Sequence, residues 1–235
     1  MGEIAERLVD VRERALSVYR RVDHAPLDEL HIVCVTKMQP VPRILEAIHA
    51  GATEIGENYL QEAVRKNVFS LRTDFAVTIR YIGRLQSNKY NAITRNFDSV
   101  DSTDPGLLEK LPLIRSRGEC RSKVFLLEVN AGDETQKGGL TIAQIQELGA
   151  ARSSWLAELS GLMVVVPLSA GPAARAIMYD DVHNLFCQLR HDLGASHFRF
   201  LSMGTSDDFE LALEHGSNMI RVGTAIFGVR PPQQV

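Results

Sequence analysis

The sequence has few of the features that mark disulfide-linked, zinc-binding or membrane proteins. Its three cysteines are odd in number and widely spaced, with no Cys-x-x-Cys pair and no clustered histidines beside them. This spacing argues against a disulfide framework and a metal site, and for a reducing compartment. The longest apolar run, residues 162–168, is far too short to cross a membrane, and acidic residues stand among the arginines of the N-terminus where a signal peptide would be apolar. We therefore expect a soluble, cytoplasmic protein that binds no metal and contacts no membrane.

The charge is also unremarkable. The formal net charge is -3 and both signs are mixed along the chain, so there is no basic stripe of the kind that nucleic acids require. With 235 residues, of which 45% are hydrophobic, the chain fits one large domain spanning 1–235 better than two domains.

Strand and helix patterns alternate along the chain. Apolar residues at steps of four and three between Ile4 and Val22 predict a leading helix. The predicted strands are 31–36, 53–56, 78–83, 97–100, 123–129, 159–165, 197–201 and 219–222, and the predicted helices between them are 41–50, 57–66, 86–93, 105–117, 142–151, 173–192 and 207–215. Eight strands separated by helices, without a long polar linker, predict a single α/β domain: a (β/α)8 barrel of the TIM type with an extra N-terminal helix. An open doubly wound sheet is the alternative.

A lysine lies at the end of the first predicted strand. In the run HIVCVTK, side chains alternate between the two faces of the strand, so Val33, Val35 and Lys37 share one face. Active sites of such barrels lie at the C-terminal ends of the strands. A lysine that is partly desolvated there loses its charge more easily and becomes a nucleophile for aldehydes. A lysine at this position can equally extend to solvent from the rim of the barrel.

The last two strand-to-helix loops, LSMGTSDD and RVGTAIFG, are rich in glycine and hydroxyl groups. Barrels commonly bind phosphate with the loops after strands seven and eight. The candidate phosphate-binding residues are Ser202, Gly204, Thr205, Gly223 and Thr224. The same residue types also form ordinary turns and helix caps, and Ser206 and Asp207 are predicted caps of the next helix.

Two further polar groups follow predicted strands. Asn58 comes directly after the second strand, and a cluster of Gln86, Ser87, Asn88 and Lys89 follows the third. Both groups are expected at the mouth of the barrel. Capping of the helices that follow is at least as good an explanation for Ser87 and Asn88 as contact with a ligand.

Seven motifs occur in an order that resembles a known family. They are VTKMQP, IGENYLQE, YIGRLQSNK, LLEVN, GLMVVVP, LSMGTSDD and RVGTAIFG, and together they span nearly the whole chain. This series is similar to the pyridoxal phosphate homeostasis proteins of the YggS/PROSC type, which are related to the N-terminal barrel of alanine racemase. The resemblance implies that Lys37 carries pyridoxal 5′-phosphate as an imine and that Asn58 lies near the ring. It also implies that Arg221 faces the pyridine nitrogen and that Ser202, Gly223 and Thr224 bind the phosphate.

Some positions depart from the usual pattern of the family. Gln39 stands where a second lysine is frequent, Arg80 replaces a frequent histidine, and Arg84 stands where proline is common. A second amine close to the pocket is therefore in doubt. Lys137 matches a lysine of the corresponding loop in the family, and its role is open.

The function that the resemblance implies is intracellular pyridoxal phosphate homeostasis. Such a protein protects the reactive aldehyde and releases the cofactor to apo enzymes, without efficient turnover. The first alternative is a pyridoxal-phosphate-dependent amino-acid racemase, but alanine racemases carry a C-terminal β domain that supplies a catalytic tyrosine, and only seven residues follow Gly228. We therefore expect a monomeric carrier, with Tyr59 and Tyr81 as packing residues. A second alternative is an aldolase that forms a lysine imine with a phosphorylated sugar.

Overall fold

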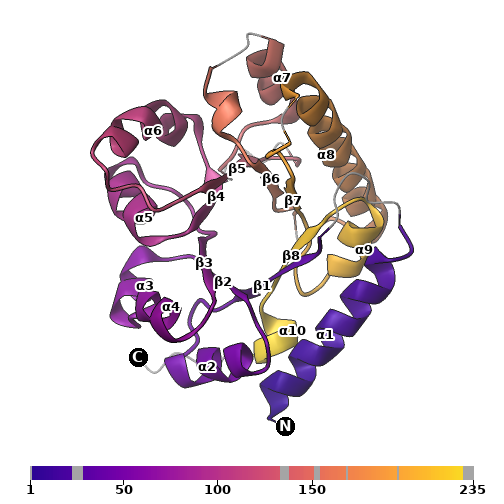
Figure 1. The fold of residues 1–235 in the computed structure, drawn as a ribbon. Coiled ribbons are helices and arrows are strands. Elements are labelled where there is room, and N and C mark those ends of the chain that lie inside the picture. The colour runs from indigo at the N-terminus through magenta and orange to yellow at the C-terminus, as the bar shows by residue number, and fades with distance from the viewer. Residues whose placement is uncertain are drawn as a thin grey trace.

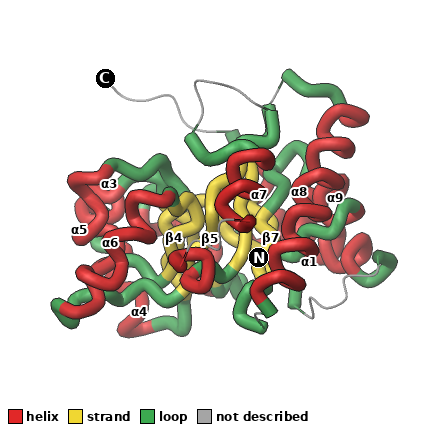
Figure 2. Tube along the Cα trace, turned by 90° about the horizontal axis from the view of Figure 1, so that it is seen from above, coloured by secondary structure: helices red, strands yellow, loops and turns green. Residues whose placement is uncertain are grey.

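The computed structural model describes residues 2–22, 29–132, 138–150, 154–167, 169–194 and 196–229. Eight parallel strands form a closed barrel in the order β1 to β8, and helices surround it (Figure 1 and Figure 2). The strands are β1 His31–Val35, β2 Glu54–Glu57, β3 Thr78–Tyr81, β4 Ser99–Thr103, β5 Val124–Val129, β6 Gly161–Val164, β7 Phe200–Ser202 and β8 Met219–Val222.

Helices follow the strands in alternation, as the sequence predicts. The α-helices are α1 Glu3–Tyr19, α2 Val41–His49, α3 Leu60–Arg65, α4 Leu71–Asp74, α5 Tyr90–Asn96, α6 Pro105–Ser116, α7 Ile142–Ala150, α8 Pro172–Leu193, α9 Phe209–Glu214 and α10 Thr224–Phe227. Three short 3-10 helices are η1 Val68–Ser70, η2 Ser87–Lys89 and η3 Ser154–Glu158.

The closed barrel and its leading helix are confirmed, and the open sheet is wrong. The barrel closes because β1 pairs with β8, with Cys34 opposite Val222. Several boundaries differ from the prediction by two or three residues, among them the start of β7, which is Phe200 rather than residue 197. The fourth strand begins at Ser99 rather than at residue 97, and the helix expected from residue 57 begins at Leu60 because Glu57 belongs to β2. The short helices α4, η1 and η3 were not predicted.

Local signals in the sequence explain where the longer helices begin and end. Asp104 precedes α6 and accepts a hydrogen bond from the Leu107 backbone N–H at 2.7 Å, while Pro105 occupies the first turn. Helix α8 also has a proline in its first turn, and it ends at Gly194, whose φ of +56° is in the left-handed region. Glycine adopts that conformation without the steric cost of a side chain.

Apolar side chains form two layers, one on each side of the sheet. The larger layer lies between the strands and the helices and includes Cys34, Ile55 and Ile79. A smaller cluster fills the inside of the barrel and consists of Val33, Leu126, Met163, Phe200 and Met219. This division confirms the predicted alternation in the first strand, with Val33 inside and Cys34 outside.

The inside of the barrel also contains a chain of charged groups, which we call the interior ion network and define as His31, Glu54, Arg80 and Asp101. His31 Nδ1 lies 2.6 Å from Glu54 Oε1, and Arg80 contacts the Glu54 carboxylate and lies 3.2 Å from Asp101 Oδ1. Burial would raise the pKa of Glu54, but the hydrogen bond from His31 and the charge of Arg80 outweigh burial and lower that pKa to about 2. Burial raises the pKa of Asp101.

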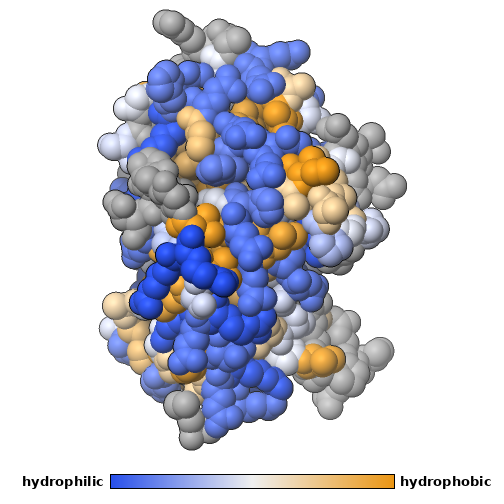
Figure 3. Space-filling view, turned by 90° about the vertical axis from the view of Figure 1, so that its right-hand side faces the viewer, coloured by the Kyte–Doolittle hydropathy of each residue, from blue (hydrophilic) through white to orange (hydrophobic). Residues whose placement is uncertain are grey.

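Helix α1 lies against α9, α10 and α2, and so joins the last helices of the barrel to the first (Figure 1). An exposed ion pair between Arg14 and Glu210, at 3.0 Å, connects α1 to α9. The face of the molecule seen in Figure 3 is mostly hydrophilic, with hydrophobic atoms in small separate groups. Within the described residues, no helix combines the length and the apolar character that a membrane span needs.

Candidate functional site

Lys37 lies just beyond the C-terminal end of β1. The strand ends at Val35, and residues 37 and 38 form a turn before α2. Thr36 is buried on the outer face, where its hydroxyl donates to Glu57 Oε1 at 2.7 Å. The alternation of side chains therefore directs Lys37 toward the mouth of the barrel, and the side chain is half-buried there.

Closure of the barrel brings the two ends of the sequence together at this mouth. A small pocket is lined by Val35, Lys37 and Gln39 from β1 and its loop, and by Gly223, Thr224 and Gly228 from the β8 side. Two of the predicted phosphate-binding residues, Gly223 and Thr224, thus share a pocket with Lys37. Thr224 is exposed, so its hydroxyl is accessible to a ligand.

Some buried polar atoms near the C-terminal ends of β1 and β2 lack a hydrogen-bond partner within the described residues, and one of the residues concerned, Gln39, lines this pocket. Among the described residues, the buried side-chain atoms without a hydrogen-bond partner are Gln39 Oε1, Arg43 Nε, Glu57 Oε2 and Asn58 Oδ1. Gln39 and Arg43 follow β1, Glu57 is the last residue of β2, and Asn58 follows it. Asn58 directly follows Glu57, which faces outward, and so its side chain faces inward like Lys37. Buried polar atoms are normally hydrogen-bonded, so an unpaired set at one end of a barrel fits a polar ligand.

Arg221 and Ser202 lie inside the barrel, on β8 and β7. Arg221 Nη1 donates to Ser202 Oγ at 2.7 Å, and Nη2 donates to the Val164 carbonyl oxygen at 2.7 Å. Both residues are buried, and burial lowers the pKa of the Arg221 guanidinium. Ser202 remains a predicted phosphate-binding residue; in this structure it is buried and its hydroxyl accepts the hydrogen bond from Arg221.

The loop after β7 approaches the loop after β8 through Ser206. Its hydroxyl accepts hydrogen bonds from the backbone N–H groups of Gly223 and Ala225, at 3.0 and 3.2 Å. The expectation that Ser206 and Asp207 cap the next helix is wrong, because the residue that precedes α9 is Asp208. The sequence alone could not identify Ser206 as a contact between the loops, since the contact depends on the pairing of β7 with β8.

The other two predicted residues of this loop have structural contacts. Gly204 has a φ of +92°, and a Cβ there would lie 2.7 Å from Ala212 Cβ and 2.8 Å from Phe209 Cα. Thr205 donates from its backbone N–H and its hydroxyl to Asp208 Oδ1, at 2.8 and 3.0 Å. Asp208 is in turn bonded to Arg175 and Tyr179 of α8. Contacts with α8 and α9 therefore hold this loop in place.

The remaining predictions for the mouth have mixed outcomes. Ser87 and Asn88 are exposed at η2, which has no side-chain cap. Tyr81 is buried and donates to the Arg84 carbonyl oxygen, as expected of a packing residue, whereas Tyr59 is 55% exposed and is not one. Lys137 lies outside the described residues.

The departures from the family pattern lie in different environments. Arg80 belongs to the interior ion network, the side chain of Arg84 is exposed, and Gln39 lines the Lys37 pocket. Gln39 is thus a pocket residue that strand-end reasoning missed, and the signal that could have found it is its place two residues after Lys37.

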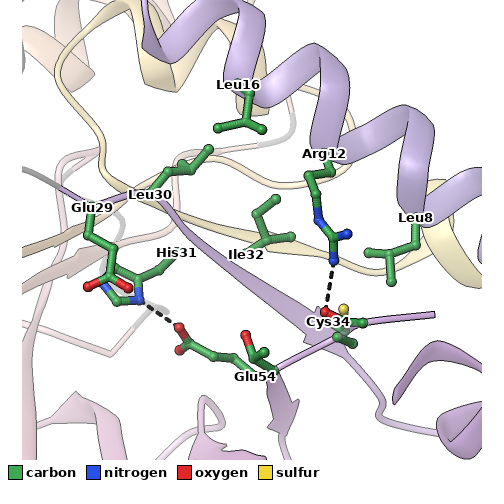
Figure 4. A pocket seen from close by; sticks show the side chains of 12 residues that line it. Leu8, Arg12, Leu16, Glu29, Leu30, His31, Ile32, Cys34 and Glu54 are labelled. Atoms are coloured by element: carbon green, nitrogen blue, oxygen red, sulfur yellow. Dashed lines mark hydrogen bonds and ion pairs between the residues drawn. The ribbon is translucent and has the colours of Figure 1, made fainter. Parts of the chain in front are cut away.

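A second pocket, of about 180 Å³, lies at the opposite end of the barrel (Figure 4). It is bordered by α1 and by the first residues of β1 and β2, including Arg12, His31 and Glu54. Arg12 Nη2 donates to the Gly51 carbonyl oxygen at 2.8 Å. The charged side chains that line this second pocket bond to one another or to the backbone. Within the described part of the chain, no group of three or more His, Cys, Asp or Glu side chains could hold a metal ion.

Comparison with known proteins agrees with this geometry. The family described as "Alanine racemase, N-terminal domain" matches residues 19–231. The pyridoxal phosphate homeostasis protein of Escherichia coli is 32% identical over 234 residues, which cover 98% of each chain. The chain belongs to the pyridoxal phosphate homeostasis family. The family resemblance predicted from the seven motifs is therefore confirmed.

Solved structures of the family have the same fold. The PipY protein of Synechococcus elongatus without pyridoxal phosphate matches with a TM-score of 0.81 and 30% identity. The structure of the same protein with pyridoxal phosphate bound matches with a TM-score of 0.78 and 29% identity. Each alignment covers 96% of this chain and 100% of the PipY chain.

Proposed function

We propose that this protein binds pyridoxal 5′-phosphate as an imine on Lys37 and releases it to apo enzymes in the cytoplasm. The observation that carries the proposal is the single pocket lined by Lys37, Gly223 and Thr224. It offers an amine for an aldehyde and, next to it, a hydroxyl for a phosphate. When bound, the cofactor supplies the aldehyde that condenses with the amine.

The chain's own residues have separate roles in this proposal. Lys37 supplies the amine, Thr224 and the backbone at Gly223 hold the phosphate, and Asn58 donates to or accepts from the ring. Ser202, Gly204 and Thr205 complete the phosphate site from the β7 side, where Ser202 also bonds to Arg221 and Thr205 to Asp208. The unpaired Asn58 Oδ1 supports a polar contact on the ring side of the pocket.

Arg221 also favours a carrier over a racemase. A guanidinium beside the pyridine nitrogen disfavours its protonation, so the ring withdraws electrons less strongly than one paired with a carboxylate. Racemisation needs two acid/base groups, one on each face of the substrate. Lys37 is the acid/base group for one face of the substrate. The Tyr81 hydroxyl donates a hydrogen bond to the Arg84 carbonyl oxygen and is not available for the other face.

Covalent mapping tests the binding site. We expect purified protein with pyridoxal phosphate to absorb as an imine, and borohydride followed by mass mapping to label Lys37. Lys37→Ala should abolish the imine band, whereas the matched control Lys89→Ala, at η2, should keep it. Labelling mainly at Lys89 or Lys137 in the wild-type protein would contradict the assignment.

Two measurements test the carrier role. The loaded protein should reactivate an apo enzyme that depends on pyridoxal phosphate, faster than the Lys37→Ala variant mixed with the same cofactor. Deuterium exchange at the α-carbon of alanine or serine should stay at the rate of free cofactor. Exchange well above that rate would identify an enzyme and overturn the carrier proposal.

A further inference from the structure

A buried cluster of three charged residues holds the backbone on both sides of Lys37. We call Glu57, Glu62 and Lys66 the Lys66 clamp. Lys66 Nζ donates to the Thr36 carbonyl oxygen at 2.9 Å, one residue before Lys37. Glu62 Oε1 accepts from the Met38 backbone N–H at 2.5 Å, one residue after it. Helix α3, which lies outside β2 and β3 (Figure 1), thus reaches across to the loop after β1.

The clamp is held together by its own charges. Lys66 Nζ lies 2.5 Å from Glu57 Oε1 and 3.0 Å from Glu62 Oε1. Glu57 has no exposed surface, and the Lys66 side chain is 10% exposed. Buried hydrogen bonds between charged groups are short and directional, so they fix positions well.

The backbone at Met38 needs such a restraint. Met38 has a φ of +61°, which places a residue with a side chain in the left-handed region. That conformation costs roughly 1–2 kcal/mol and persists only where neighbouring contacts impose it. The hydrogen bond from Met38 N–H to Glu62 and the bond from Gln39 N–H to the Thr36 carbonyl oxygen both restrain the turn that carries Lys37.

The clamp also separates the roles of two neighbouring lysines. An ammonium group has three N–H donors, and Lys66 directs them to Thr36, Glu57 and Glu62. All three donors of Lys66 are engaged in the clamp, and Lys66 does not line the pocket that Lys37 lines. Lys66 therefore stays structural although it is close to the mouth.

We propose that Glu62 and Lys66 are positioning residues, which hold the turn at residues 36–38 so that Lys37 meets the aldehyde in a reactive geometry. The inference rests on the proposed function of Lys37 and deepens it. Misplacement of a reacting group by about 1 Å can slow a reaction up to about a hundredfold, so loss of one restraint should be measurable in the rate of imine formation.

The first experiment compares Glu62→Ala with Gln61→Ala, an exposed neighbour on the same helix. Glu62→Ala removes the bond to Met38 and leaves Lys66 paired with Glu57. We expect imine formation with pyridoxal phosphate, followed by stopped-flow absorbance, to slow about tenfold in Glu62→Ala and to be unchanged in Gln61→Ala. Glu62→Gln keeps an acceptor for Met38 N–H and should recover most of the rate.

Binding of pyridoxine 5′-phosphate separates positioning from general damage. This probe keeps the ring and the phosphate but has an alcohol in place of the aldehyde, so it cannot form an imine. Its affinity, measured by calorimetry, should change less than about twofold in Glu62→Ala, because it does not use the Lys37 amine. An unchanged rate of imine formation in Glu62→Ala would overturn the positioning role. So would a loss of affinity for pyridoxine 5′-phosphate as large as the loss in the imine rate.

A measurement on the wild-type protein does not depend on the folding of a variant. The Met38 amide should exchange slowly with deuterium, as expected of a partly buried N–H bonded to a carboxylate. Fast exchange at Met38 would overturn the clamp. Failure of the wild-type protein to form an imine would instead refute the proposed function, and the exchange result would still decide whether the clamp exists.

Discussion

The interior ion network of the barrel differs from Gln39 and Asn58 at its C-terminal mouth in whether the buried polar atoms are hydrogen-bonded. In the interior ion network, Glu54 is bonded to both His31 and Arg80, and Arg80 also reaches Asp101. At the mouth, Gln39 and Asn58 each bury an oxygen that has no hydrogen-bond partner among the described residues. Satisfied charges in the interior stabilise one arrangement of the strands, while unsatisfied atoms at the mouth are available for a ligand.

This difference indicates where substitutions should change stability and where they should change binding. Removing one partner from a satisfied buried pair leaves a charge without compensation, which is expensive. Removing an atom that has no protein partner leaves nothing unpaired.

Arg80→Met should destabilise the fold by about 3–5 kcal/mol, because it leaves Glu54 and Asp101 buried without their shared cation. Denaturant unfolding followed by circular dichroism measures the change. The control is Arg84→Met, four residues away and exposed, for which we expect a change within about 0.5 kcal/mol. Equal, small effects for both would mean that the interior network does not stabilise the barrel.

The Glu54 carboxylate should stabilise the protein at neutral pH and lose that effect in acid. Its pKa falls from 4.5 to about 2 on folding, so its contribution is complete above about pH 4.5 and disappears as the pH falls toward 2. The difference in unfolding free energy between wild type and Glu54→Gln should therefore be on the order of 3 kcal/mol at pH 6 and shrink toward pH 2. A difference that is constant with pH would contradict the lowered pKa.

Thr224→Val should weaken binding of pyridoxal phosphate about ten- to a hundredfold, since a hydrogen bond to a charged group contributes about 1.5–3 kcal/mol. The much weaker binding of pyridoxal, which lacks the phosphate, should hardly change. Titration of both ligands by absorbance makes the comparison. Equal loss for both would mean that Thr224 only supports the fold.

Asn58→Leu should change stability by less than about 1 kcal/mol, because the side-chain oxygen that it removes has no partner in the part of the chain that the structure describes. The affinity of the variant for pyridoxal phosphate should nevertheless fall several-fold. Unfolding and cofactor titration of the same preparation provide the two values. A large loss of stability with normal binding would reverse the contrast between mouth and interior.

The sequence predicted the order and kind of the main elements because the periodicities are strong and glycine, proline and aspartate mark the boundaries. Alternation in the first strand predicted that Val33 and Lys37 share a face, and Val33 does lie in the inner cluster. The pocket that joins Lys37 to Gly223 and Thr224 agrees with the strand-end reasoning, while their roles remain predictions.

Other features depend on contacts that no local pattern contains. No sequence pattern indicates that Ser206 binds the backbone after β8, or that Glu62 and Lys66 hold the turn around Lys37. A helical i, i+4 spacing of Glu62 and Lys66 predicts an ordinary surface pair. Only the packing of α3 against the loop after β1 turns that pair into a buried clamp.

By itself, the sequence determined an alternating α/β chain, a lysine at the end of its first strand and hydroxyl-rich loops after its last two. These features are local, since they depend on side-chain periodicity and on the conformational preferences of single residues. The tertiary structure decided which of them meet. Closure of β1 on β8 places residues near opposite ends of the chain in one pocket, and burial inside the barrel decides which charges are paired and which polar atoms are left for a ligand.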